Sequence, residues 1–172
     1  MVAGYLGSLG HVIPRKKRQR LKEGDVFVVP LSDGTFSLGQ ILARERQALN
    51  AIACAFYKIR IVNGPTVEVP ASLPQDQVIS IILTIPDALN RAAWPVVTDR
   101  AIPTSIAVRP YEKYREAKWV GARIIGSGIV VQFLNAYFGL APWNVMHDPN
   151  YFDGLLLDGS LRPNHLVFKR VA

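Results

Sequence analysis

Hydrophobic residues occur in short, β-branched runs along the first half of the chain. Residues 25–30 form one run, and residues 35–42 alternate large and small side chains after a Ser-Asp-Gly sequence that suits a tight turn. Together the two runs predict a β-hairpin. The even-numbered side chains of the second run would share one face. Gly39, on the other face, marks a bulge or a close approach to its backbone.

The following runs predict the rest of a sheet. Residues 51–61 are apolar on both faces in their first half, which is typical of a strand at the centre of a sheet. Residues 78–85 form another β-branched run, which ends at Pro86. Shorter elements complete the pattern: a helical turn at 87–91 and brief strands at 94–97, 155–157 and 165–171.

The strongest helical pattern comes late in the chain. From Ile129 to Leu140, apolar side chains recur at spacings of three and four residues, and Gly139 stands where this helix would end. Ser127 is a candidate N-cap. Because strands outnumber helices and do not alternate regularly with them, we expect an α+β fold. Its sheet would be mainly antiparallel and strongly twisted or barrel-like, with this one principal C-terminal helix packed on it.

The composition is that of a globular domain. The chain has 172 residues, of which 49% are hydrophobic and 19% charged, enough to bury a sizeable core. Residues 124–143 carry no charge, but their Gly, Gln, Asn and Pro content favours a buried helix over a membrane span. The single cysteine, Cys54, excludes an internal disulfide and lies in an apolar run typical of a structural cysteine. We therefore expect a cytoplasmic protein without membrane association.

The positive charge is concentrated near the N-terminus. The formal charge is +7, and five of the basic residues lie within residues 15–20, so removing those five charges leaves only +2. We therefore expect residues 1–20 to be a basic, mobile leader and residues 21–172 to form one β-rich domain. A nucleic-acid partner is disfavoured except through the leader.

The densest polar and aromatic cluster covers residues 143–154. His147, Asp148 and Asp153 could share a divalent metal ion whose bound water would act as a nucleophile. The alternative is an ordered turn that Asp148 organises. The turn is favoured, because the cluster has neither the spacing of a calcium-binding loop nor a paired-histidine motif.

Arginine and aromatic residues alternate between residues 94 and 119, with acidic residues among them. Such mixing is more typical of a protein interface than of a phosphate-binding strip, which needs uninterrupted positive charge. We expect the anchors of a protein-binding surface at four residues, Trp94, Arg109, Trp143 and Tyr151.

Two stretches resemble the immunity protein 26 family. The first is KEGDVFVVPL from Lys22, followed by Asp33-Gly34 and by Phe36, Leu38, Gly39 and Gln40, and the second is DPNYFD with LLLDG after it, within residues 148–159. The resemblance implies a cytoplasmic protein of bacterial polymorphic-toxin systems that binds a cognate toxin and blocks it. The family name is also attached to small proteins described as organophosphate phosphotriesterases.

The sequence thus leaves three functions open. The leading hypothesis is an immunity protein without enzymatic activity or cofactor, whose exposed aromatic and arginine side chains cover a toxin. The second is a metal-assisted phosphotriesterase hydrolase that uses His147, Asp148 and Asp153 both as metal ligands and as its catalytic residues. The third is nucleic-acid binding through the basic leader.

Overall fold

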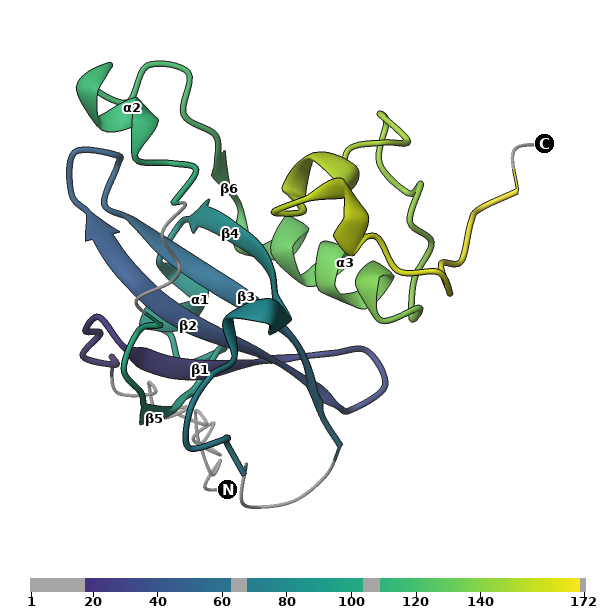
Figure 1. The fold of residues 1–172 in the computed structure, drawn as a ribbon, viewed down its shortest axis with the longest axis horizontal. Helices are drawn as coiled ribbons and strands as arrows, with labels where there is room; N and C mark the ends of the chain where they lie inside the picture. The colour runs from purple at the N-terminus through teal and green to yellow at the C-terminus, as the bar shows by residue number, and fades with distance from the viewer. Residues whose placement is uncertain (1–17, 63–67, 104–108, 171–172) are drawn as a thin grey trace, which may run out of the picture.

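Six strands form one open sheet in the order β5-β1-β2-β3-β4-β6 across the residues that the structure describes (Figure 1). This structure is a computed structural model that describes residues 18–62, 68–103 and 109–170. The strands are β1 (Asp25–Pro30), β2 (Phe36–Glu45), β3 (Ala51–Ile61), β4 (Val78–Thr84), β5 (Val96–Asp99) and β6 (Ile124–Ile125). The α-helices are α1 (Asp87–Asn90), α2 (Lys113–Glu116) and α3 (Ser127–Tyr137), and short 3-10 turns lie at Gln75–Gln77, Asp153–Leu155 and Gly159–Leu161.

The predicted α+β class is confirmed. All neighbouring strands run antiparallel except β4 and β6, which pair in parallel. Within the described chain, β5 and β6 remain the two edges, so the sheet does not close into a barrel. Helix α3 is the longest helix in this part of the chain and packs on one face, as its apolar spacing predicted (Figure 1).

The first hairpin folds as predicted, and Asp33 organises its turn. Its carboxylate accepts hydrogen bonds from the Thr35 amide at 3.1 Å and from the Thr35 hydroxyl at 2.7 Å. Arg60 of β3 forms an ion pair with the same carboxylate. These contacts lower the pKa of Asp33, the Thr35 hydroxyl having the largest effect, although partial desolvation opposes them.

This geometry predicts how the turn responds to acid. Because the pKa of Asp33 is lower in the folded state, its contribution to stability is complete above the unfolded value of about 3.9 and disappears as the pH falls through the folded value. An NMR titration of the Asp33 carboxyl should have its midpoint below that of an unfolded-chain peptide. Thr35→Val, which removes the hydroxyl donor, should raise this midpoint. An equal midpoint in the two proteins would contradict the assignment.

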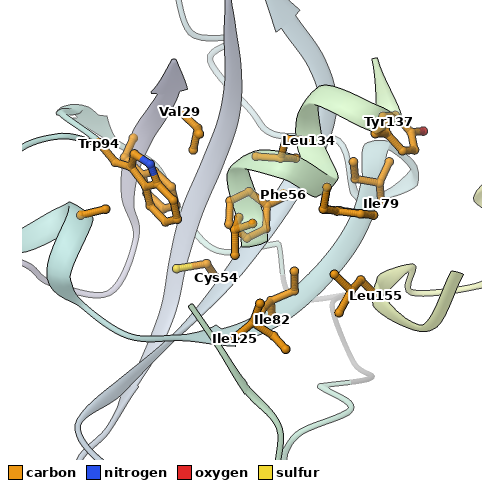
Figure 2. Close-up of a cluster of buried hydrophobic side chains, with 14 of the residues drawn as sticks. Val29, Cys54, Phe56, Ile79, Ile82, Trp94, Ile125, Leu134, Tyr137 and Leu155 are labelled. Carbon is orange, nitrogen blue, oxygen red and sulfur yellow. The ribbon is translucent and has the colours of Figure 1, made fainter. Parts of the chain in front are cut away.

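Both faces of the central strands are buried, as the apolar run at residues 51–57 predicted. Cys54 and Phe56 belong to one core, which α3 covers, and Ala55 and Tyr57 belong to a second core on the opposite face. Figure 2 shows Phe56 and Leu134 of α3 in the first core. Burial raises the pKa of the Cys54 thiol, which keeps it protonated and makes it a structural residue.

Three local predictions are wrong. Gly126, not Ser127, is the N-cap of α3, and the Ser127 hydroxyl instead donates to Asp87 at 2.9 Å. The leucines at 155–157 do not form a strand, because Leu155 ends a 3-10 turn and enters the core. The last predicted strand reduces to one bridge between Pro142 and Val167 among the described residues.

Only the end of the predicted leader lies within the described residues, since residues 1–17 fall outside them. There the Gln19 side chain donates to the carbonyls of Leu89 at 2.6 Å and Trp94 at 3.0 Å, and it accepts from the Val96 amide at 2.8 Å. These three hydrogen bonds attach the end of the predicted leader to the domain at Gln19. Among the described residues, no helix is long and apolar enough to cross a membrane.

Candidate functional site

The structure buries two of the four predicted anchors. Trp94 is 2% exposed and stacks on Phe27, with ring centroids 5.7 Å apart and an interplanar angle of 4°. Trp143 is 1% exposed, and its indole N–H donates to Asp153 at 3.3 Å. The expectation that these two tryptophans are exposed is therefore wrong, because their large apolar rings belong to the core that α3 covers.

Arg109 and Tyr151 are partly exposed, as anchors of a surface must be. The Arg109 guanidinium lies 3.8 Å from the carboxylate of Glu112. The ring of Tyr151 lies under the guanidinium of Arg123, whose central carbon is 4.9 Å from the ring centroid. The contact of Tyr151 with Arg123 was not predicted, because the two residues come from separate segments of the chain.

The three candidate metal ligands are not brought together. No group of three or more His, Cys, Asp or Glu side chains in the described part of the chain could hold a metal ion. Asp148 instead accepts from the Asn150 amide at 2.9 Å, so it organises the turn, as the alternative interpretation held. Asp153 accepts from Trp143 and lies 3.4 Å from Arg162. His147 is exposed.

A groove of about 190 Å³ lies along the edge of β4. Its floor is apolar and comes from the end of β4 and from Ile125 of β6. We call Pro110, Tyr111, Lys113 and Tyr114, around the start of α2, the α2 wall of the groove. Arg123 and residues 154–157 complete the lining. Figure 2 shows the side chains of Ile82, Ile125 and Leu155, three of the lining residues, grouped together. An apolar floor with a few polar groups at its rim is the usual character of a binding site.

An ion-pair network fixes the α2 wall of the groove. Glu45, at the end of β2, is 8% exposed and pairs with Arg115. Arg115 also lies 3.4 Å from Glu112, and its guanidinium covers the buried ring of Tyr111. The hydrogen bond to Glu45 raises the pKa of Arg115, and burial raises that of Tyr111. This wall is therefore fastened to the sheet, although it has little regular structure.

Two cations at the rim of the groove remain available to a ligand. Lys113 lies 5.1 Å from the ring centroid of Tyr114, and Arg123 is similarly held against Tyr151. Both are exposed, and neither forms an ion pair with an acidic side chain of the described residues. Cation–π contacts position such side chains without neutralising their charge.

A second hollow of about 330 Å³ lies where the leader meets the domain. Its lining is mainly cationic and polar, formed by Arg18, Gln19, Arg20, Leu21, Arg44 and Asn90. Leu21 is the single apolar side chain among the residues that line this hollow, whereas a stable protein interface has an apolar centre. We therefore take the groove beside β4 as the candidate functional site.

Sequence reasoning missed this groove. Its lining comes from three segments, at residues 81–83, 110–125 and 154–157, that are far apart in the chain. None of them carries a catalytic or ligand-binding motif. The only signal was the mixture of arginine and aromatic residues around Lys113, which indicated an interface but not its location.

Comparison with known proteins identifies a family. The family model of Immunity protein 26 matches residues 22–118, which is more than half of the chain. No curated protein and no solved structure shows significant similarity to it. The β4 floor and the α2 wall of the groove lie within the matched residues, whereas Arg123 and residues 154–157 follow them.

Proposed function

The chain belongs to the immunity protein 26 family, and from this premise we propose that it binds a cognate protein toxin and blocks it, using the groove beside β4 as the contact surface. An immunity protein has to recognise one partner and needs no catalytic machinery. The observation that supports this location is the pair of uncompensated cations, Lys113 and Arg123, above an apolar floor. Apolar area at the centre and charge at the rim is the usual arrangement of a protein interface.

The surviving anchors fit this proposal. Tyr151 supports Arg123 at the groove, and Arg109 belongs to the segment that forms the α2 wall. Arginine and tyrosine are among the residues that most often dominate binding energy at interfaces. We propose that Arg123 and Tyr151 act as one anchor, with Arg109 as a secondary contact. Trp94 and Trp143 are buried and would make no direct contact with the toxin.

Replacing Arg123 with alanine should weaken toxin binding about tenfold, because a rim cation preorganised over an aromatic ring would be lost. The measurement is calorimetric titration of the purified protein with a catalytically inactive form of the toxin encoded by the neighbouring gene. Arg91→Ala is the matched control, since Arg91 is an exposed arginine outside the groove. It should bind like the unmodified protein.

Two results would count against the proposal. The first is the absence of both binding and growth protection when the protein and the toxin are produced together. The second is equal affinity in the Arg123→Ala and Arg91→Ala variants, which would place the contact elsewhere. Chelator-sensitive turnover of a paraoxon-type substrate, with metal in the purified protein, would instead support the hydrolase alternative.

A further inference from the structure

Strand β4 is only partly covered along the edge that faces away from β3. Strand β6 pairs with β4 at Leu83 and Thr84 alone. The C-terminal segment reaches the same edge at Ile79, whose carbonyl accepts from the Leu157 amide at 2.8 Å. Ile81 lies between these two contacts and lines the groove. The centre of the groove is therefore a short stretch of strand edge between two covered stretches.

The backbone groups of Ile81 are directed toward this edge. Alternate residues of a strand point their N–H and C=O groups to the same neighbour. The Ile85 amide, just after β4, donates to the Ile125 carbonyl of β6 at 3.3 Å. The backbone N–H and C=O groups of every second residue before Ile85 therefore also point toward the β6 side of the strand. Leu83 and Ile81 are the first two of these residues, so the backbone groups of Ile81 point toward the β6 side. Ile82, in contrast, faces β3, opposite Cys54.

We propose that the groove receives an extended, acidic segment of the partner toxin, which pairs with the backbone of Ile81 as an added strand. This inference rests on the proposed function and specifies how the toxin would be held. Strand addition at an exposed sheet edge is a common mode of peptide recognition, in which backbone hydrogen bonds supply affinity and the flanking side chains supply selectivity. The two ends of the groove limit the pairing to a few residues.

Charge selects the occupant. Lys113 belongs to the α2 wall and Arg123 also lines the groove, so both cations would lie beside a segment that runs along β4. Carboxylates of that segment would pair with them, while its alternate side chains would meet the apolar floor formed by Ile82 and Ile125. A nucleic acid would instead need a continuous positive strip, whereas among the described residues that line the groove Lys113 and Arg123 are the cations.

Hydrogen exchange tests the backbone pairing. In the full-length protein alone, the Ile81 amide should exchange faster than the Ile82 amide, which faces β3. In the complex with inactive toxin, Ile81 exchange should slow by about tenfold or more, equivalent to about 1.4 kcal/mol of added protection, while Ile82 stays unchanged. Two-dimensional NMR of the free and saturated protein resolves both amides.

Charge reversal tests the selection. The double variant Lys113→Glu with Arg123→Glu should weaken toxin binding by about a hundredfold, through lost pairing and added repulsion. The matched control is Lys58→Glu with Lys169→Glu, which changes the net charge equally at exposed lysines that do not line the groove. This control variant should weaken toxin binding by less than about threefold, because it changes only the long-range electrostatic attraction between the two proteins. Both variants should melt at the temperature of the unmodified protein.

The outcomes separate this inference from the proposed function. A complex that forms without added protection at Ile81 overturns strand addition and leaves toxin binding intact. Equal weakening of binding in the two double variants overturns the preference for an acidic segment, and it too leaves toxin binding intact. If no complex forms at all, the proposed function fails and this inference fails with it.

Discussion

Replacing Trp143 with alanine is expected to lower the free energy of unfolding by about 3–5 kcal/mol, the usual loss for a fully buried large aromatic side chain. The ring is 1% exposed, and its centroid lies 5.9 Å from that of Phe133 and 5.5 Å from that of Phe152. These neighbours come from α3 and from the C-terminal segment, so the indole joins two parts of the core. Urea denaturation followed by circular dichroism measures the loss.

Trp143→Phe is the matched control for this substitution. It keeps an aromatic ring in the same place but removes the N–H that donates to Asp153 and part of the buried ring, so about 1–2 kcal/mol should be lost. The core assignment would be wrong if Trp143→Ala retained normal stability and lost toxin binding. That combination would identify Trp143 as an interface anchor, as the sequence alone suggested.

Most of the sheet could be predicted from the sequence, because its strands carry local patterns. The alternation in residues 35–42 and the double-sided apolar run at 51–57 reflect which faces are buried, and turns mark the ends. Helix α3 followed in the same way from its spacing of three and four. Each of these patterns lies within about a dozen residues, so no knowledge of distant contacts was needed.

The errors have a common cause in tertiary contacts. The sequence shows that Trp94 and Trp143 are large and partly polar, but it does not show which apolar surfaces cover them. The leucines at 155–157 have the composition of a strand, yet Leu155 is taken up by the core and the Leu157 amide is held by Ile79. In both cases packing overrides local preference.

The groove is the clearest example of information that only the fold supplies. Tyr151 and Arg123 lie far apart in the sequence, and the fold alone brings the C-terminal segment against Arg123. The length of β6 also matters, because a longer strand would cover Ile81 and remove the open edge. A two-residue strand gives too weak a sequence pattern to predict this boundary.

Replacing Gly39 with alanine is expected to destabilise the protein by about 1–3 kcal/mol, although the change adds a single methyl group. An added Cβ would collide with Cζ of Phe27 and lie 2.6 Å from its Cε2. The Phe27 ring cannot easily withdraw, because it is stacked on Trp94 and meets Phe56 edge-on with centroids 5.9 Å apart. The close approach predicted at Gly39 is therefore the contact of its backbone with this ring.

Gly128→Ala is the control, since Gly128 lies in α3 with open space around it and helices favour alanine over glycine. It should raise stability by about 0.5–1 kcal/mol in the same denaturation experiment. Phe27→Leu should relieve part of the clash, so the double variant with Gly39→Ala should lose less stability than the sum of the two single variants. Strict additivity would show that the ring is not the obstacle.

Gly39→Ala also tests whether the Gly39-Gln40 pair, part of the resemblance to the family, serves stability or toxin binding. Gly39 is followed by Gln40, whose amide donates to the Arg100 carbonyl at 3.0 Å and whose oxygen accepts from the Tyr57 hydroxyl at 2.9 Å. Gly39 and Gln40 are both buried in β2, between β1 and β3, and neither lines the groove. Gly39→Ala should therefore lose stability but, at a temperature where it remains folded, bind toxin with normal affinity. A loss of affinity in the folded variant would show that this pair acts on the toxin contact as well as on the core.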